Sequence, residues 1–379
     1  MPIVTDHVFF LFGGYWFPVQ GLVFQNTCQT SLKIANVGKI KTPKQQERHK
    51  IASETCTKGA ALPLLLYIVK RLLSLIPVLF VISVVIFLIM HITPGDPAAI
   101  MLGEEATEDQ IQELREELGL NTPLVQQYVD WVINVVQGDL GYSYFMKQSV
   151  TSALISHLGP TFSLAVLAQI VALVIAIPAG IMAATRRGSL SDQSLMAFSL
   201  FGMSVPSFLL ALFLILVIGV QLRWLPIAGF QPLSDGLWNS LQYLILPAIS
   251  LGTIQAALIA RMTRTSMLEV LHANFIKTAR AKGVKERNIV YRHALRNAFL
   301  PILTVIGQTF GTLVAGGVVT ETIFNIPGIG QMVVNSIERR DYPVIQGVIL
   351  FITVSYVFIN LMIDLLYAYI DPRVRLERK

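Results

Sequence analysis

Six long runs without Asp, Glu, Lys or Arg constrain this chain more than any other feature. They cover residues 72–90, 158–185, 193–222, 236–260, 297–320 and 342–363. About 20 apolar residues in a helix cross the roughly 30 Å hydrocarbon core of a bilayer, and a helix satisfies its own backbone there. The sequence therefore predicts an all-α, polytopic membrane protein with six transmembrane helices. The third run has 30 residues, so it must include a loop or an interfacial turn.

The composition favours the same class. Apolar residues make up 54% of the chain and charged residues 14%, whereas soluble domains carry roughly 25% charged residues. A net charge of +6 can indicate nucleic-acid binding, but here the Lys and Arg residues lie beside the apolar runs. Membrane orientation explains that pattern better, so we expect a multi-pass protein of the cell membrane and no nucleic-acid partner. Cys28 and Cys56 both precede residue 62, which excludes a disulfide framework in the remainder.

The distribution of Lys and Arg predicts the orientation. With the loop 261–297 in the cytoplasm, that side carries 17 Lys and Arg residues and the opposite side carries five. The seventeen lie at 70–71, at 186–187, in the loop, which holds nine, and at 373–379. The five are Arg115, Lys147, Arg223, Arg339 and Arg340. Positive residues stay inside, so both ends of the six-span unit are predicted to be cytoplasmic, and the loop is a candidate docking surface for a cytoplasmic protein.

The largest segment on the outer side covers about 93–157. Thr107-Glu-Asp-Gln110 has the pattern of a helix capping box, and Gly119 predicts the end of that helix. A second amphipathic stretch covers about 124–136, and Gly138-Asp-Leu-Gly141 predicts turns. Two interpretations remain open: a structural cap over the bundle, or a docking site for an external protein.

The first 61 residues differ from the rest. An uncharged stretch at 8–32 is interrupted by glycine and proline, and a polar, mildly basic stretch at 33–58 follows it. No methionine lies between Met1 and Met90. We hypothesise that residues 1 to about 63 are an artefact of the assigned start or a dispensable extension.

Several motifs of enzymes and carriers are missing from the sequence. It has no Gly-x-x-x-x-Gly-Lys-Ser/Thr loop to hold nucleotide phosphates, no cluster with metal-ligand spacing and no nucleophile–base pair. The clearest ionisable residue in the spans is Asp364, at a cytoplasmic end, whereas ion-coupled carriers place polar groups near mid-membrane. We therefore expect no enzyme activity, metal or cofactor in this chain, and an energy source in another subunit.

Two patterns concern the region around the fifth span. Gly307-Gln-Thr-Phe-Gly311 is a small-xxx-small pattern, which favours close helix packing and leaves open a role in lining a pathway. Glu321 to Gly330 predicts an outer re-entrant turn followed by a short helix.

A set of short motifs in a fixed order resembles one family of membrane transporters. The motifs are Tyr67-Ile-Val-Lys-Arg-Leu-Leu73, Thr93-Pro-Gly-Asp-Pro97, Gly138-Asp-Leu-Gly141, Ser204-Val-Pro-Ser-Phe208, Trp224-Leu-Pro226, Thr278-Ala-Arg-Ala-Lys-Gly283, Arg292-His-Ala-Leu-Arg-Asn297, Glu321-Thr-Ile-Phe-Asn-Ile-Pro-Gly-Ile-Gly330, Arg340-Asp-Tyr-Pro343 and Asp371-Pro-Arg373. Across about 310 residues they resemble the permease subunits of binding-protein-dependent ABC importers, in the "B"-type permeases of the dipeptide, oligopeptide and nickel branch.

The resemblance implies the type I importer permease fold and a division of the chain. A first transmembrane helix is implied at 62–92, an extracytoplasmic segment at 93–157 and the transmembrane domain at 149–368, which carries the cytoplasmic coupling loop 261–297. It also implies a heterodimer with a homologous second permease, two cytoplasmic P-loop ATPases that bind ATP and Mg, and an extracytoplasmic solute-binding protein. The chain itself would contact membrane lipid and hydrolyse nothing.

The coupling loop is the part that the resemblance places against the ATPase. The implied contact residues are Asn274, Phe275, Thr278, Ala279, Arg280, Ala281, Lys282 and Gly283. Phe275 would seat in a groove of the ATPase, Gly283 would end the helix, and Lys277, Arg280 and Lys282 would pair with acids. The alternative is an interfacial helix whose cations face anionic lipid.

The residue pattern predicts how that helix begins. Ser266-Met-Leu-Glu269 has the form of a capping box. Met267, Leu271, Phe275 and Ala279 then recur every four residues, which predicts one continuous helical face.

This chain departs from the general permease signature in two places. Lys277-Thr-Ala279 stands where the signature has Glu-Ala-Ala, and Leu300-Pro301 lies farther from Gly283. Both departures resemble the peptide branch. Short peptides are the commonest solute that the resemblance implies, so they are the expected solute, with nickel or another small solute as the alternative. No residue is assigned to the substrate pathway. Outside this family, a non-transporting membrane scaffold or sensor and a self-sufficient carrier or channel are the competing hypotheses.

Overall fold

The computed structural model describes residues 11–12, 15–16, 61–92, 97–102, 106–117, 119–143 and 145–370. The chain divides into two units, Met1–Leu62 and Pro63–Lys379. In the first unit, Leu11–Phe12 (β1) pairs antiparallel with Tyr15–Trp16 (β2). The hypothesis about the first 63 residues falls almost entirely outside the described residues. The same is true of most of the motifs that begin at Thr93 and Asp371, and of the side chain of Asp364.

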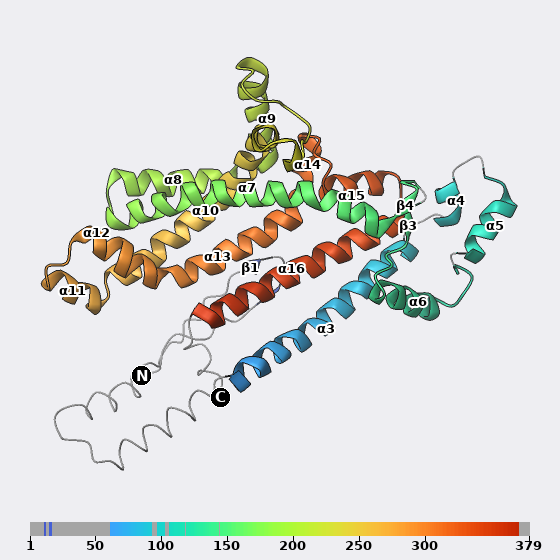
Figure 1. Cartoon of the computed structure of the whole chain (residues 1–379), viewed down its shortest axis with the longest axis horizontal. Helices are drawn as coiled ribbons and strands as arrows, with labels where there is room; N and C mark the ends of the chain where they lie inside the picture. The colour runs from blue at the N-terminus through green and yellow to red at the C-terminus, as the bar shows by residue number, and fades with distance from the viewer. Residues whose placement is uncertain are drawn as a thin grey trace, which may run out of the picture. The chain divides into compact units, whose positions relative to one another are not determined.

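Helices form nearly all of the described second unit. The long ones are α3 (Ala61–Ile92), α7 (Val150–Thr185), α10 (Leu237–Leu271), α13 (Leu295–Gly316) and α16 (Tyr342–Ile370). Figure 1 shows α7, α10, α13 and α16 running alongside one another. The short helices are α4 (Pro97–Leu102), α5 (Glu108–Glu117), α6 (Leu124–Val136), α8 (Leu190–Ser204), α9 (Ser207–Leu214), α11 (Asn274–Ala281), α12 (Glu286–Asn288), α14 (Val318–Ile323) and α15 (Ile329–Glu338).

The remaining elements are short. Two π-helical turns, Ile215–Gln221 and Ile289–Ala294, adjoin α9 and α13, and a 3-10 turn covers Leu233–Asp235. A small hairpin of Tyr142–Ser143 (β3) and Gln148–Ser149 (β4) leads into α7. The expectation of an all-α fold is confirmed.

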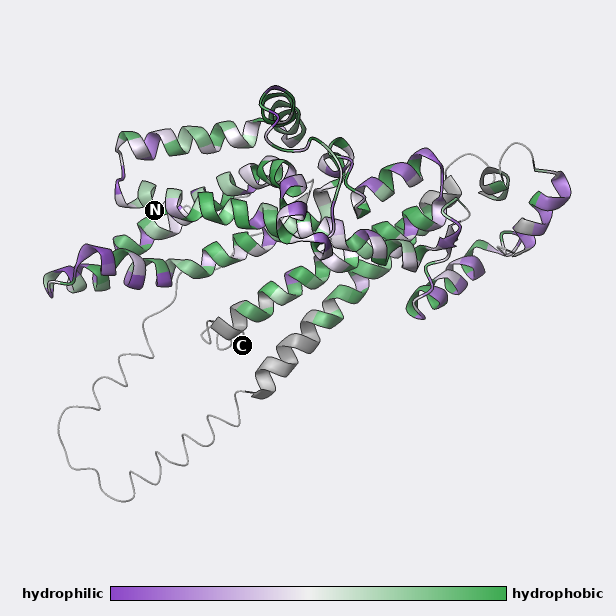
Figure 2. Cartoon of the chain, turned by 45° about the horizontal axis from the view of Figure 1, so that its top comes forward, coloured by the Kyte–Doolittle hydropathy of each residue, from purple (hydrophilic) through white to green (hydrophobic). Residues whose placement is uncertain are grey.

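Several of the described helices can cross a membrane. Four are long and apolar enough, namely Val150–Thr185, Leu237–Leu271, Glu286–Ala315 and Tyr342–Ile363. A bent pair, Leu190–Ser204 and Ser207–Gln221, makes a fifth if it is one span. Figure 2 shows that apolar residues dominate these long helices. The described apolar stretch of α3, Leu75–Leu88, is shorter, so the count of six stays a prediction.

The bend between α8 and α9 confirms that the 30-residue apolar run contains a break. The helix axis bends by 97° between the two arms. Pro206 supplies no N–H and directly precedes the first residue of α9, and Val205 has extended backbone angles of φ −85° and ψ 119°. Both features are expected where a proline interrupts a helix, because its ring disfavours helical angles in the preceding residue.

Glycines allow the long helices to approach closely. A Cβ on Gly180 of α7 would lie 2.6 Å from the Cβ of Thr263 on α10, and a Cβ on Gly307 of α13 would overlap the side chain of Ile363 on α16. Small residues at such crossings are a common packing device in membranes. The contact of Gly307 with α16 supports the packing interpretation of the small-residue pattern that begins there.

The outer segment folds as its sequence predicted. The backbone N–H of Thr107 donates to Gln110 Oε1 at 3.0 Å, and the N–H of Gln110 donates to Thr107 Oγ1 at 3.4 Å, which is the reciprocal capping box. Gly119, with φ +63°, follows the end of α5. The predicted amphipathic stretch is α6, and Gly138 and Gly141 adopt positive φ in the predicted turns.

Helix α6 lies against the C-terminal half of α3. The hydroxyls of Ser83 and Tyr128 are 2.7 Å apart. The ring of Phe87 lies 5.4 Å from that of Tyr128 and 6.1 Å from that of Trp131, measured between centroids. Edge-on and tilted aromatic pairs at these distances are favourable. These contacts favour the structural interpretation of this part of the outer segment.

A buried carboxylate organises the predicted re-entrant segment between α13 and α16. Glu321 of α14 accepts hydrogen bonds from Thr161 Oγ1 of α7 at 2.7 Å and from the backbone N–H groups of Gly330 and Gln331 at 2.7 and 3.2 Å. Thr161 Oγ1 in turn accepts from the N–H of Ile329 at 2.8 Å. Burial raises the pKa of the Glu321 carboxyl above its ordinary value, and the three hydrogen bonds oppose that shift. The start of α15 is thereby fixed to both α14 and α7.

We predict that Glu321→Gln destabilises this region by about 1–3 kcal/mol, because an NH2 group, which cannot accept, replaces either Oε1, which accepts from Thr161, or Oε2, which accepts from both backbone N–H groups. The measurement is the thermal unfolding temperature of the purified protein in detergent. Glu338→Gln, at the exposed end of α15, is the matched control. Equal unfolding temperatures for the two variants would contradict the assigned role.

Candidate functional site

The predicted coupling loop begins later than its sequence indicated. Helix α10 continues to Leu271, and α11 starts only at Asn274. Ser266 therefore lies buried inside α10, and the predicted capping box at that position is wrong. A Ser-x-x-Glu pattern caps a helix only where the preceding chain leaves the helical path, and here α10 runs straight through it.

The predicted continuous face is also wrong. Met267 and Leu271 belong to α10, whereas Phe275 and Ala279 belong to α11. The residue before α11, Ala273, has extended backbone angles and makes no side-chain cap. Two helices joined by a tight turn thus replace the single helix.

Ile276 anchors α11 to the bundle. It is fully buried and belongs to one apolar cluster with Ile181 of α7, Met267 of α10 and Ile302 of α13. No role for Ile276 was predicted from the sequence. The available signal was that Ile276 is the only branched aliphatic residue between Asn274 and Gly283.

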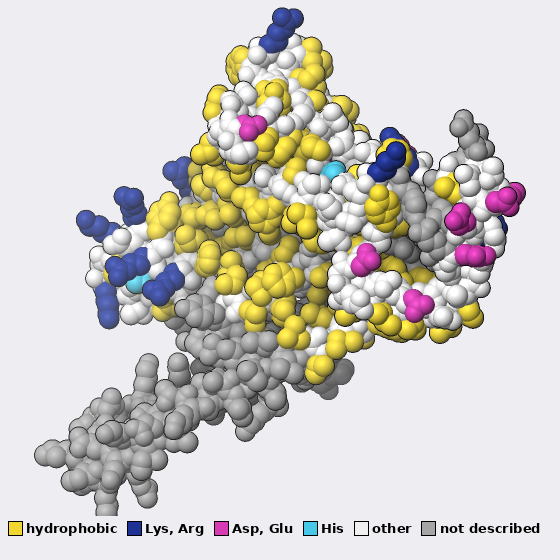
Figure 3. Space-filling model, turned by 45° about the vertical axis from the view of Figure 1, so that its right-hand side comes forward, with side chains coloured by type: hydrophobic (Ala, Val, Ile, Leu, Met, Phe, Trp, Pro, Cys, Tyr) yellow, Lys and Arg dark blue, Asp and Glu magenta, His cyan; other side chains and the backbone are white. Residues whose placement is uncertain are grey.

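The predicted contact residues lie together on the outside of this short helix and its end. The exposed ones are Asn274, Phe275, Thr278, Arg280, Ala281, Lys282 and Gly283, and Ala279 is half-buried. Phe275 keeps 46% of its surface exposed. In Figure 3, Lys and Arg side chains gather at one end of the described bundle and Asp and Glu side chains at the other. The arrangement offers an aromatic side chain within a basic surface.

The cations of α11 differ in their surroundings. Arg280 Nε donates to Glu286 Oε1 of α12 at 2.7 Å, and its Nη2 donates to Oε2 at 3.4 Å. Both side chains are exposed, so this pair contributes little to stability. Arg280 thus already has a partner within the chain, whereas Lys277 and Lys282 are exposed.

Gly283 ends the helix as predicted. Its φ is +75°, its N–H donates to Arg280 O at 2.9 Å, and the N–H of Val284 donates to Ala279 O at 3.2 Å. This is the hydrogen-bond pattern of a glycine-terminated helix. The left-handed angle favours glycine at this position.

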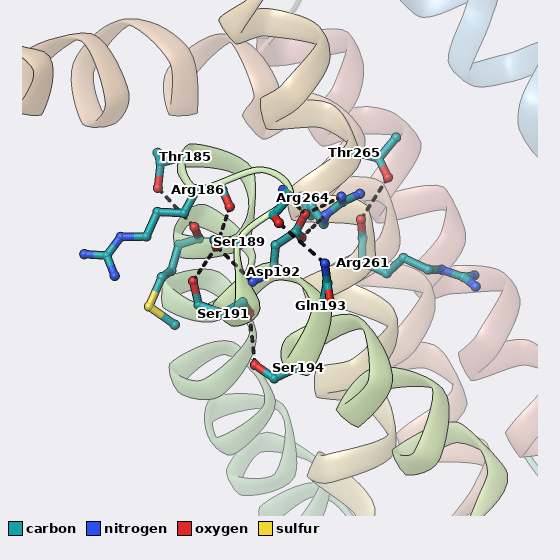
Figure 4. A network of polar contacts seen from close by, with 12 residues as sticks. Thr185, Arg186, Ser189, Ser191, Asp192, Gln193, Ser194, Arg261, Arg264 and Thr265 are labelled. Atoms are coloured by element: carbon teal, nitrogen blue, oxygen red, sulfur yellow. Dashed lines mark hydrogen bonds and ion pairs between the residues drawn. The ribbon is translucent and has the colours of Figure 1, made fainter.

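An ion pair joins α8 to α10, close to the coupling loop. Asp192, near the start of α8, accepts from Arg264 Nε at 2.6 Å and from Arg264 Nη2 at 2.9 Å. Figure 4 shows this contact between α8 and α10. This pair was not predicted, because the two residues are 72 positions apart in the sequence.

Among the described residues, no group of three or more His, Cys, Asp or Glu side chains is placed to hold a metal ion. What these residues present is a short amphipathic helix, buried on one side and exposed on the other.

The comparisons with known proteins identify the family. Residues 176–376 match the binding-protein-dependent transport system inner membrane component, and residues 64–165 match the N-terminal part of such membrane components. The chain belongs to this family. Membership supports a multi-pass membrane protein that works with a binding protein, and the matched segments include α11.

The similarity to individual relatives extends over nearly the whole length of those proteins. The probable peptide ABC transporter permease protein y4tP of Sinorhizobium fredii is 45% identical over 309 residues, which are 82% of this chain and 99% of that protein. The glutathione transport system permease protein GsiC of Escherichia coli K12 is 43% identical over 309 residues, or 82% and 98%. A solved structure of the inward-facing MetNI methionine ABC transporter is a distant match, with 19% identity over 58% of this chain and 96% of that one and a TM-score of 0.49.

The buried and exposed sides of α11 predict different mutational effects. Ile276→Ala should loosen α11, because truncating a fully buried aliphatic side chain costs about 2–5 kcal/mol. Phe275→Ala should leave α11 in place, because Phe275 is largely exposed. Hydrogen exchange of residues 274–283 measures both. Faster exchange in the Phe275 variant than in the Ile276 variant would overturn this assignment.

The backbone of Gly283 gives a second prediction. Gly283→Ala places a Cβ in the left-handed region, which costs about 1–2 kcal/mol, and should fray the end of α11. Gly202→Ala, at a helical position of α8 where the nearest atom to the added Cβ would be 3.8 Å away, should be neutral or stabilising. Thermal unfolding of the two variants gives the comparison, and an equal effect would be contrary to expectation.

Proposed function

We propose that this chain is a permease subunit of an ATP-driven ABC importer that moves short peptides delivered by a solute-binding protein. The observation that carries the proposal is membership of the binding-protein-dependent family, together with relatives 43–45% identical over nearly their entire length. One relative is named as a probable peptide permease and another as a glutathione permease. Glutathione is itself a tripeptide, so both names support a peptide solute.

The proposed assembly contains further subunits. A homologous second permease pairs with this chain, and two cytoplasmic P-loop ATPases bind ATP and Mg and perform the hydrolysis. The solute-binding protein docks on the outer side, and membrane lipid surrounds the spans. In this assembly the chain has a first transmembrane helix at 62–92 and a transmembrane domain at 149–368, and it acts as a conduit without enzyme activity or a cofactor of its own.

The coupling loop 261–297 is the proposed point of contact with an ATPase. Phe275 seats in a groove of the ATPase, and Thr278, the half-buried Ala279 and the cations beside it complete the contact. Closure of the two ATPases on ATP displaces α11. Because Ile276 packs against α7, α10 and α13, that displacement acts on the whole bundle, and the permease pair alternates between inward and outward access.

Other functions have less support. Nickel or another small solute remains the alternative within the family, but the two relatives are named for peptide and glutathione transport. A membrane scaffold without transport shares the docking helix but needs no binding protein. Transport measurements separate these possibilities.

The test is uptake of labelled di- to pentapeptides and glutathione in cells with and without this gene, with nickel measured in parallel. We expect deletion to reduce ATP-dependent peptide uptake by at least about tenfold, and Gly283→Pro to reproduce the loss because proline distorts the end of the docking helix. Reduced nickel uptake with normal peptide uptake would identify nickel, and not a peptide, as the solute. If deletion changed the uptake of none of these solutes, the proposed transport of these solutes by this chain would be contradicted.

A further inference from the structure

The ion pair between α8 and α10 is held in a fixed geometry. Both carboxylate oxygens of Asp192 bind the fork of Arg264, at 2.6 and 2.9 Å. Asp192 Oδ2 also accepts from the backbone N–H of Gly188 at 3.0 Å, and Ser189 Oγ accepts from the N–H of Asp192 at 3.4 Å. The carboxylate thus closes the turn between α7 and α8 and holds α10 with the same atoms.

The pair lies next to the proposed docking helix. Arg264 is followed along α10 by Met267, which packs in the same apolar cluster as Ile276 of α11. Leu195 of α8 packs against that cluster as well. The start of α8, the end of α10 and the buried face of α11 therefore meet in one place.

The pair connects α10 to the one bent span of the described bundle. Helix α8 begins beside Asp192 and ends at the 97° bend to α9. Near that bend, Gly202 of α8 passes Ala257 of α10, with a Cβ at Gly202 placed 3.8 Å from that of Ala257. Helix α8 thus follows α10 along its length, in apolar contact near the bend and in ionic contact at its start.

An ion pair is suited to fixing position more than to adding stability. Replacing a buried pair by apolar side chains is often neutral for stability, whereas a two-bond Arg–carboxylate contact fixes both the distance and the orientation of the groups. Apolar contacts such as that of Gly202 permit sliding. The fork of Arg264 opposes sliding of α8 along α10.

We propose that the Asp192–Arg264 pair is a positioning device that makes the bent span α8–α9 move together with the docking helix α11. The inference rests on the proposed function, since α11 moves only if an ATPase drives it. Breaking the pair is expected to leave ATPase docking and hydrolysis in place and to reduce the transport obtained from each ATP.

The first experiment uses the complete importer in proteoliposomes and compares ATP hydrolysis with uptake of a labelled tripeptide. For Asp192→Asn we expect hydrolysis within about twofold of the wild type and about tenfold less uptake per ATP, the size of a typical coupling between sites. Arg186→Gln is the matched control, because its side chain points away from Asp192 in Figure 4 and is exposed. Uptake per ATP that is unchanged in Asp192→Asn would overturn the proposal.

A double variant separates positioning from stability. Asp192→Leu with Arg264→Met leaves no uncompensated buried charge, so the importer should assemble and unfold like the wild type. Uptake per ATP should nevertheless stay low. Normal uptake per ATP in this variant would show that apolar packing alone joins α8 to α10, and the proposal would fail.

A third measurement does not depend on the solute. With Cys28 and Cys56 replaced by serine, a fluorescent label on Ser204→Cys reports on the bend between α8 and α9. Trapping the ATPases with ATP and vanadate should change the emission, and Asp192→Asn should abolish that change. A change that persists in Asp192→Asn, or none in the wild type although the ATPases co-purify, would contradict the proposal. Failure of the ATPases to co-purify would instead contradict the proposed function.

Discussion

The requirement that buried backbone polar groups find partners within the protein shapes the end of the bundle at which α14 and α15 lie. Between α13 and α16 the chain turns back as α14 and α15, so the N–H groups that begin α15 need acceptors. Glu321 and Thr161 supply them from α14 and α7. One buried carboxylate therefore permits a break in the helical bundle without leaving those donors unpaired.

The other end of the bundle divides its tasks among neighbouring residues. Ile276 fixes α11 from within, Gly283 ends it, and Phe275 faces outward. A short helix of this kind would be marginal alone. The stability of α11 comes from the apolar cluster that it shares with three long helices. In the proposed mechanism, the same cluster transmits a displacement of α11 to those helices.

Local signals were predictable from sequence, whereas long-range ones were not. The capping box of Thr107 and Gln110 depends on residues close in the chain and was predicted. A break within the 30-residue apolar run was predicted from its length, although its position at Pro206 was not. The pattern at Ser266 failed because it lies inside a continuing helix, where only tertiary packing decides. The Asp192–Arg264 pair and the hydrogen bonds of Glu321 join residues far apart in sequence, so one sequence without relatives held no signal for either.

The separation between Thr161 and Glu321 also bears on how the protein is made. Ser83 and Tyr128, which join α3 to α6, are 45 residues apart, whereas Thr161 and Glu321 are 160 apart. Chains grow from the N-terminus at about 5–20 residues per second. On the ribosome, Thr161 is therefore added roughly 8–30 s before Glu321, the residue that accepts its hydrogen bond. During biogenesis the contact between α3 and α6 can form early, whereas the contact between α7 and α14 can form only after residue 321 has been added.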